Sequence, residues 1–398
     1  MKDNISKLKD CYGCGVCVKA CPVKIISLKE NKDGFYAPVI ENQDKCVECG
    51  LCLKVCAYNH DEVAGDASDV KAFAAWSKDP LVRQWCSSGG VGFEVGRKLI
   101  NEGFEAVGVR FDPKKNRAEH YVAATVEDFM PSVGSKYIPS YTVDGFNALD
   151  RKRKYLVTGT PCQIDSFRRY IRHFKAEDKF VLLDFFCHGV PSLLLWDKYT
   201  ADVRKKIGEI TFASWRNKST GWHDSWSMNA DRSELPKDSE TIDWHDSYNL
   251  EIREKKHFYA SRMSQGDLFY RFFLGNYCLN KCCYSTCKYK MCGSAADIRI
   301  GDLWGRKYAD DDKGVNSVLA FTEKGKQLLS ELYSCEIIPE SVETAAEGQM
   351  YHNAHKPITR NQVVAALHGP MSLYAIYNSI ILAGRVVNKL FRITKIKK

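Results

Sequence analysis

The N-terminal region contains two four-cysteine runs with the same spacing: Cys11, Cys14, Cys17 and Cys21, then Cys46, Cys49, Cys52 and Cys56. In a cubane iron–sulfur run of this spacing, three thiolates bind one cluster and the fourth binds the other cluster. We therefore expect a first 4Fe-4S cluster on Cys11, Cys14, Cys17 and Cys56. We expect a second on Cys46, Cys49, Cys52 and Cys21. Zinc or disulfides are the alternative, but a zinc site does not need eight cysteines in a repeated run.

The two runs also form an internal repeat. Between them, Asp33 and Gly34 have turn chemistry and separate two short apolar stretches, 25–28 and 35–40. This pattern predicts a β-hairpin on which the clusters rest. Residues 1–66 are therefore expected to form a bacterial-type ferredoxin domain with two clusters.

The composition leaves room for more than a ferredoxin. With 398 residues, 44% of them hydrophobic and 27% charged, the chain is long enough for two further domains. The first ten residues do not resemble a signal peptide, and thiolate ligands of clusters are oxygen-sensitive, so the 17 cysteines indicate a reducing cytoplasm.

The region 67–205 alternates between strand-like and helix-like segments. We expect strands at 70–76, 104–111, 120–125, 155–157 and 180–186, and helices at 91–101, 144–151, 161–170 and 193–203. Strand–turn–helix units of this kind predict a parallel α/β sheet. Residues 206–340 are expected to form a further domain, with strands at 207–216, 222–228 and 297–301, a polar excursion over 229–252 and a helix at 265–274.

Three segments that precede helices carry unusual residues. They contain Ser88, Gly89 and Gly90, then Gly159, Thr160, Pro161, Cys162 and Gln163, then Cys187 and His188. The carboxyl ends of parallel strands share one sheet edge, and helix N-termini favour phosphate. A ligand site is therefore expected there, although Ser-Ser-Gly-Gly alone is also an ordinary way to begin a helix.

A second cysteine group comprises Cys278, Cys282, Cys283, Cys287 and Cys292. Its spacing is less regular than that of either metal template. A third cubane, a structural zinc site and plain buried cysteines all remain open from the residues alone.

Together, Ser88–Gly90, Lys136, residues 158–163 and 187–192, and the cysteine block that leads into residues 296–305 resemble the coenzyme F-420 hydrogenase/dehydrogenase beta-subunit family. The resemblance, with the ferredoxin domain, covers about residues 1–335. It implies an FAD-binding domain that exchanges electrons with nearby clusters. Members pass hydride to or from deazaflavin or reduce other organic substrates; one branch reduces a chlorophyll intermediate, and many bacterial relatives accompany polysaccharide-synthesis genes.

The resemblance also suggests roles for individual residues. The flavin phosphates would lie at Ser88, Gly89 and Gly90 and at Gly159, Thr160, Pro161 and Gln163, with Lys136 as charge partner. His188, Cys162 and Cys187 would lie at the reacting end, although His188 is equally a turn residue and the two thiols are equally ligands or buried residues. A third cluster would use Cys278, Cys283 and Cys287, but one extra residue between Cys283 and Cys287 departs from the family pattern.

The expected fold is α+β: a ferredoxin domain over 1–66, an α/β FAD-binding domain over 67–205, a mixed C-terminal domain over 206–340 and a basic tail over 341–398. The expected function is an oxidoreductase that passes electrons between 4Fe-4S clusters and FAD, with a redox partner protein or reduced ferredoxin and a small organic substrate. The alternatives are an electron-transfer subunit without its own substrate, and a scaffold with structural clusters and no flavin.

The C-terminal tail carries most of the chain's net charge of +9, because no Asp or Glu follows Glu347. This local excess argues against general nucleic-acid binding. The apolar stretch 371–384 is shorter than the ~20 residues that span a bilayer. We expect an amphipathic helix with Arg385, Lys389 and Arg392 on one face and Val386, Val387, Leu390 and Phe391 on another, which packs on the body or docks peripherally on a membrane at its inner surface.

Overall fold

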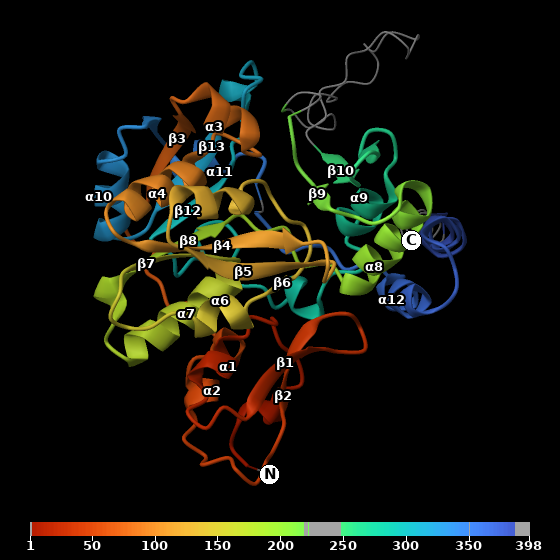
Figure 1. Ribbon diagram of the computed structural model, residues 1–398, viewed down its shortest axis with the longest axis horizontal. Helices are drawn as coiled ribbons and strands as arrows, with labels where there is room; N and C mark the ends of the chain where they lie inside the picture. Colours follow the sequence, from red (N-terminus) through yellow and green to blue (C-terminus); the bar gives the residue numbers. More distant parts are fainter. Residues whose placement is uncertain (1, 219–221, 223–247, 350, 387–398) are drawn as a thin grey trace, which may run out of the picture.

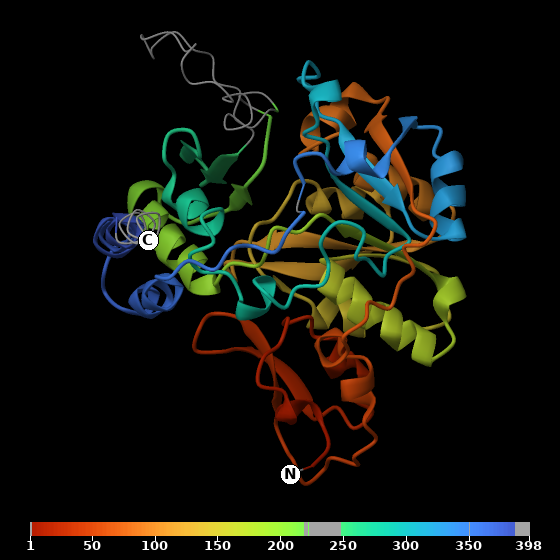
Figure 2. The same cartoon turned by 180° about the vertical axis from the view of Figure 1, so that it is seen from behind.

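The computed structural model describes residues 2–218, 222, 248–349 and 351–386. The fold is mixed α+β, with an N-terminal ferredoxin-type domain below a large central sheet and a smaller unit of helices and strands beside that sheet (Figure 1). The view from behind shows the same three parts, with the ferredoxin domain again at one end (Figure 2).

The ferredoxin domain is built on the predicted hairpin. Strands β1 (Ile26–Glu30) and β2 (Tyr36–Ile40) pair antiparallel, and the short helices α1 (Val16–Ala20) and α2 (Leu51–Lys54) each follow a cysteine turn. Gly15 and Gly50 begin these helices with φ of 71° and 68°, a conformation that glycine adopts without steric cost. The repeat in the sequence is therefore a repeat in structure.

The central sheet has nine strands in the order β14-β3-β13-β12-β8-β7-β4-β5-β6. Their bounds are β3 Lys71–Ser77, β4 Glu105–Asp112, β5 Arg117–Ala123, β6 Ser140–Tyr141, β7 Tyr155–Thr158, β8 Phe180–Phe185, β12 Ile298–Asp302, β13 Asn316–Ala320 and β14 Cys335–Glu340. The four central strands β12, β8, β7 and β4 are parallel, whereas β13, β3 and β14 on one side and β5 on the other pair antiparallel. The expected parallel sheet thus forms only the centre, because short turns such as the one between β4 and β5 can join only antiparallel strands.

Helices cover both faces of the sheet. One face carries α3 (Pro80–Trp85), α4 (Val91–Asn101), α5 (Val126–Phe129) and α10 (Glu323–Ser330); the other carries α6 (Val143–Asn147) and α7 (Pro161–His173). Leu156 faces the first layer and its neighbour Val157 the second, and both are fully buried. The central strands are apolar on both faces for this reason.

The sheet crosses the expected boundary at residues 205/206. Strands β12, β13 and β14 come from the region expected to form a separate domain, yet they complete the sheet that β3 to β8 begin. Helix α11 (Val342–Ala346) also packs on β3 and β13.

The smaller unit contains an antiparallel sheet of β9 (Phe212–Ser214), β10 (Asn249–Arg253) and β11 (Phe258–Arg262), with helices α8 (Leu193–Ile207), α9 (Leu268–Phe273), α12 (Arg360–His368) and α13 (Leu373–Ile376). Its core includes Trp196, Trp215 and Phe269, all fully buried. This unit lies against the edge of the main sheet near β6, above the ferredoxin hairpin (Figure 1).

Two segments of the smaller unit differ from expectation. The strand predicted at 207–216 is reduced to β9, because α8 continues to Ile207 and ends at Gly208, whose φ is 88°. The polar excursion predicted over 229–252 ends in strand β10, where Leu250 and Ile252 alternate into the core. The strand expected at 222–228 lies outside the described residues apart from Trp222.

The C-terminal segment is helical as expected where it is described. Helix α13 continues through a π-helical turn (Tyr377–Leu382), and Ile376, Tyr377 and Ile381 are buried in the core of the smaller unit. Arg385 donates from Nε to the Tyr277 hydroxyl at 2.9 Å. The remainder of the predicted basic face, with Lys389 and Arg392, lies outside the described residues. No helix in the described ranges is long and apolar enough to cross a membrane.

Candidate functional site

The first thiol group lies where the ferredoxin domain meets the main sheet. Burial raises the pKa of the Cys17 thiol, and the adjacent thiols of Cys14, Cys11 and Cys56 raise it further. These are the four residues expected to bind the first cluster. The backbone N–H of Gly13 donates to the Cys11 sulfur at 3.1 Å, the type of contact that stabilises a thiolate ligand.

The second thiol group lies at the outer end of the ferredoxin domain. Cys21, Cys46, Cys49 and Cys52 line one small cavity, which brings together the residues expected to bind the second cluster. Asn4 donates from Nδ2 to the Cys46 sulfur at 3.4 Å. Cys49 is exposed, so this end of the domain is open to a redox partner.

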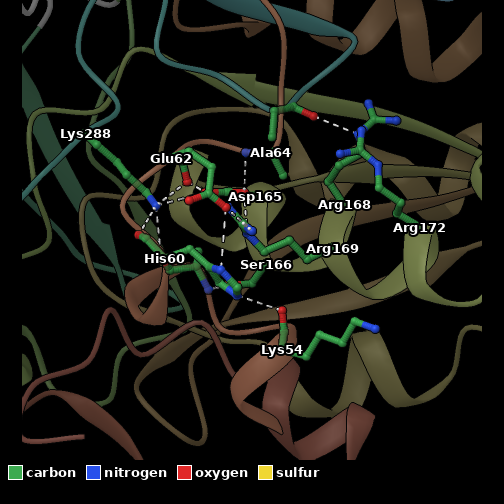
Figure 3. Close-up of polar contacts among 12 residues, drawn as sticks. Lys54, His60, Glu62, Ala64, Asp165, Ser166, Arg168, Arg169, Arg172 and Lys288 are labelled. Carbon is green, nitrogen blue, oxygen red and sulfur yellow. Dashed lines mark hydrogen bonds and ion pairs between the residues drawn. The ribbon is translucent and has the colours of Figure 1, made fainter. Parts of the chain in front are cut away.

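Helix α7 connects the ferredoxin domain to the rest of the chain. Asp165 accepts hydrogen bonds from the Ala64 backbone at 3.0 Å and from the Tyr289 hydroxyl at 2.7 Å, and Arg169 donates to the same carboxylate at 3.2 Å. Figure 3 shows Asp165 among Ala64, Arg169 and Lys288, with Glu62 beside them. Ser166, the next residue, accepts from the Ala57 backbone at 3.0 Å and lies 3.3 Å from the Cys14 sulfur.

The C-terminal cysteine block is hydrogen-bonded to the segment that follows the first thiol group. The ammonium group of Lys288 donates to the carbonyls of Ala57, His60 and Glu62 at 2.9, 2.7 and 2.7 Å. Lys288 follows Cys287 directly, so these bonds hold the cysteine block against the segment that leaves the first thiol group.

A third thiol group forms from three separate parts of the chain. Burial raises the pKa of the Cys162 thiol, and the nearby thiols of Cys187, Cys14 and Cys283 raise it further. Burial likewise raises the pKa of Cys187 to about 11, with Cys287 among its neighbours. Cys162, Cys187, Cys283 and Cys287 therefore influence one another in pairs, and Cys282 lies near Cys283 as well. No three His, Cys, Asp or Glu side chains among the described residues are placed closely enough to hold a single metal ion.

Cys278 is not part of this group. It is fully buried in the core of the smaller unit. Burial raises the pKa of its thiol, and the groups that lower it in part are the Ser192 backbone and Arg360, with no other thiol among them. The expected ligand set Cys278, Cys283 and Cys287 is therefore not brought together. Cys162 and Cys187 instead lie near the cysteine block, because the turns after β7 and β8 lie beside it; a Cβ atom on Gly189 would lie 3.3 Å from Cys283 Cβ.

A cavity of about 350 Å³ opens at the carboxyl ends of the central strands. Of the residues expected at the ligand site, it is lined by Ser88, Gly90, Lys136, Gly159, Thr160, Gln163, Cys187 and His188. The convergence of three helix-start segments on one sheet edge is thus confirmed. Gly89 and Pro161 lie behind the wall, and Cys162 is in the third thiol group.

The two helix starts at the cavity differ in their free donors. At α4, the N-cap Gly90 has no side chain, but Asn316 Oδ1 accepts from the backbone N–H of the first helical residue, Val91, at 3.0 Å. The start of α7 is closed by a capping box in which the Thr160 backbone N–H donates to Gln163 Oε1 at 2.8 Å. An anion at α4 would therefore meet the backbone of Gly92, which lines the cavity, rather than the N–H of Val91.

Lys136 and His188 have surroundings that limit their expected roles. Lys136 donates to the carbonyls of Pro131, Ser132, Val133 and Gly134 at 2.8–3.0 Å and organises that loop. Burial lowers the pKa of His188 to about 4, so its imidazole is neutral near pH 7. His188 lines the cavity, and its buried Nε2 atom has no hydrogen-bond partner in the described chain; the Asn276 side chain and the Phe273 backbone are its polar neighbours.

Both halves of the site match known protein families. Residues 10–60 match the 4Fe-4S dicluster domain. Residues 152–344 match the family described as the C terminus of the coenzyme F420 hydrogenase/dehydrogenase beta subunit. Residues 152–344 are therefore similar to this beta-subunit family.

The two matches support a redox role for the chain, with iron–sulfur clusters at its N-terminal cysteines. Among solved structures, it is similar to a chain of "Xenon derivatization of the F420-reducing NiFe hydrogenase complex from Methanosarcina barkeri", with 16% identity, a TM-score of 0.44 and coverage of 68% of this chain and 81% of that chain. No curated protein matches it.

The residues of the chain fit the cofactors that the resemblance implied. Both N-terminal groups supply four thiols with N–H donors to sulfur, as a cubane requires. The cavity has the start of α4 in its wall, an unpartnered imidazole nitrogen on a lining residue and a volume within the roughly 300–1,000 Å³ of ordinary ligand pockets. These features suit a phosphate-bearing ring system such as a flavin.

Several residues at the site were not expected from the sequence. Tyr12, between the first two cluster cysteines, lines the cavity and lies beside the thiols of Cys162 and Cys287. Gln349 lines the cavity, and the buried guanidinium of Arg216 lies behind its wall. Only Tyr12 had a recognisable signal, its place inside a cysteine run.

Proposed function

We propose that this chain is an iron–sulfur flavoprotein that exchanges electrons between 4Fe-4S clusters and FAD and so reduces or oxidises a small organic molecule. When bound, clusters transfer single electrons and a flavin transfers one or two, so that the pair can exchange a hydride equivalent with an organic substrate. The wall shared by the cavity and the first cluster loop, formed by Tyr12 and Gly13, supports this proposal most directly.

The residues that would hold each group follow from their surroundings. The flavin phosphates would lie at the segment Ser87–Gly90 and the Gly92 backbone at the start of α4, with positive φ at Gly90 allowing close backbone approach. His188 would offer its free Nε2 atom to the ring or to the substrate. A third 4Fe-4S cluster would be held by Cys162, Cys187, Cys283 and Cys287, between the first cluster and the cavity.

The proposed partner is a redox protein that meets the outer end of the ferredoxin domain. Cys49 is exposed there, and Val23, Val39 and Val47 are 40%, 38% and 60% exposed around the second thiol group. An apolar rim around an exposed ligand suits transient docking of an electron carrier. The organic substrate is a deazaflavin or another small molecule, and anaerobic turnover with each would identify it.

The test compares Gly90→Asp with Gly90→Asn. Both side chains tolerate the φ of 87° at this position better than most residues, and they differ only in charge. The carboxylate would oppose a phosphate at the start of α4, so Gly90→Asp should bind FAD at least tenfold more weakly than Gly90→Asn. The iron content of both variants should equal that of the wild type.

Flavin and iron are measured on the same anaerobic samples after incubation with FAD. Wild-type protein with full iron and no flavin would exclude a flavoprotein and leave an electron carrier with clusters alone. Equal FAD affinity in the two variants would show that the phosphates of the flavin do not bind at the start of α4.

A further inference from the structure

Two buried donors at one end of the cavity have no partner in the described parts of the chain. The side chain of Arg216 is 1% exposed, and its Nε and Nη2 atoms are both unpaired. Gln349 is 9% exposed, lines the cavity, and has an unpaired Nε2 atom. Buried donors are almost always satisfied in folded proteins, so an unpaired guanidinium edge and an unpaired amide near one cavity indicate a missing acceptor.

The guanidinium of Arg216 is held in one orientation. Its Nη1 atom donates to Asp302 at 2.9 Å and to the Tyr137 hydroxyl at 3.3 Å. Its plane lies over the rings of Tyr248 and Trp304, at 4.6 and 5.2 Å from their centroids. All four of these neighbours line the cavity.

The unpaired atoms of Arg216 form a fork. Nε and Nη2 lie on the same edge of a guanidinium and donate in parallel, which matches the two oxygens of a carboxylate or phosphate. Asp302 accepts from the Nη1 atom instead, so the Arg216 charge stays paired while the Nε–Nη2 edge is free.

Gln349 adds a neutral donor from a segment that packs on Trp304. A Cβ atom on its neighbour Gly348 would lie 2.7 Å from Trp304 Cβ, so this segment is pressed against Trp304. Arg216 and the segment that carries the Gln349 amide therefore both pack against Trp304. Lys218, whose ammonium donates to the Ser88 carbonyl at 2.7 Å, adds positive charge behind this end of the cavity.

We propose that the Nε–Nη2 edge of Arg216 and the amide of Gln349 form an oxyanion subsite, which binds a carboxylate or phosphate group of a ligand in the cavity. The group belongs either to the organic substrate, which is then an acid or phosphate ester, or to the flavin. This assignment of the ligand class rests on the proposed function, but the binding of an oxyanion can be measured without it.

The probe is inorganic phosphate, titrated by calorimetry into flavin-free and FAD-loaded full-length protein under anaerobic conditions. Arg216→Lys keeps the charge and removes the fork, and Gln349→Leu removes the amide. Each should weaken phosphate binding about tenfold or more, because a hydrogen bond to a charged group is lost. Arg110→Lys, at a 47% exposed arginine outside the cavity lining, should bind phosphate as the wild type does.

Thermal unfolding separates binding from folding. Gln349→Leu should not lower the unfolding temperature of the phosphate-free protein, because it removes an unpaired buried amide.

Phosphate binding to FAD-loaded protein assigns the subsite to the organic substrate, and binding that FAD displaces assigns it to the flavin. A protein that takes up no FAD but still binds phosphate through Arg216 would keep the subsite and refute the flavoprotein. Phosphate binding that is absent, or equal in the wild type, Arg216→Lys and Gln349→Leu, would overturn the subsite.

Discussion

At the scale of single residues, His120 shows how burial sets a protonation state. Its side chain is 1% exposed, Nε2 lies 3.1 Å from the Thr158 carbonyl, and burial lowers its pKa to about 4. The folded state therefore binds fewer protons than the unfolded state between about pH 4 and pH 6.5, so His120 makes the protein less stable as the pH falls through this range.

We expect His120→Gln to reduce this acid sensitivity, since Gln can still donate to Thr158. Between pH 7 and pH 5, the variant should lose about 2 kcal/mol less of its free energy of unfolding than the wild type. Anaerobic denaturant titrations at the two pH values measure the difference. His257→Gln, at a 69% exposed histidine, is the control; the same loss in His120→Gln and in the wild type would contradict the prediction.

At the scale of elements, α7 joins the linker after the ferredoxin domain to the cysteine block. Asp165→Asn removes the buried carboxylate that binds Ala64, Tyr289 and Arg169. Loss of such a buried partner costs about 3–5 kcal/mol. The segment 60–70 should be cleaved faster in limited proteolysis, while the iron content is retained.

The matched control is Glu62→Gln. Glu62 also pairs with Arg169, at 3.0 Å, but its side chain is 68% exposed, so its loss should cost less than about 1 kcal/mol. Equal proteolysis rates in Asp165→Asn and Glu62→Gln would show that the buried carboxylate does not fasten the domain.

At the scale of the whole molecule, three thiol groups and one cavity form a continuous series. The second group lies at the open end of the ferredoxin domain, the first at the join with the sheet, and the third beside the cavity. Each cubane contains four irons, so we expect about 12 irons per chain.

Cys283→Ser should lower this iron content by about four, whereas Cys278→Ser should leave it unchanged because Cys278 lies in an apolar core. Iron and labile sulfide are measured on anaerobic samples of both variants. A loss of iron in Cys278→Ser and not in Cys283→Ser would restore the ligand set expected from the sequence.

The sequence by itself determined the features that depend on local spacing. The spacing within each N-terminal cysteine run, the hairpin between the runs, the start of α4 after Gly90 and the start of α7 at Pro161 all follow from patterns within single short segments. Predictions from local patterns were wrong where a short strand lies within a polar segment, as at β10, and where a helix extends beyond its apolar residues, as at α8.

Only the tertiary structure decided which distant residues meet. Cys162, Cys187 and Cys283 are brought together by the order of β7 and β8 in the sheet and by Lys288, which fastens the cysteine block. Arg216 and Gln349 converge on Trp304 in the same way. Such contacts depend on strand order and on packing between elements more than 100 residues apart, and no periodicity within a segment encodes them.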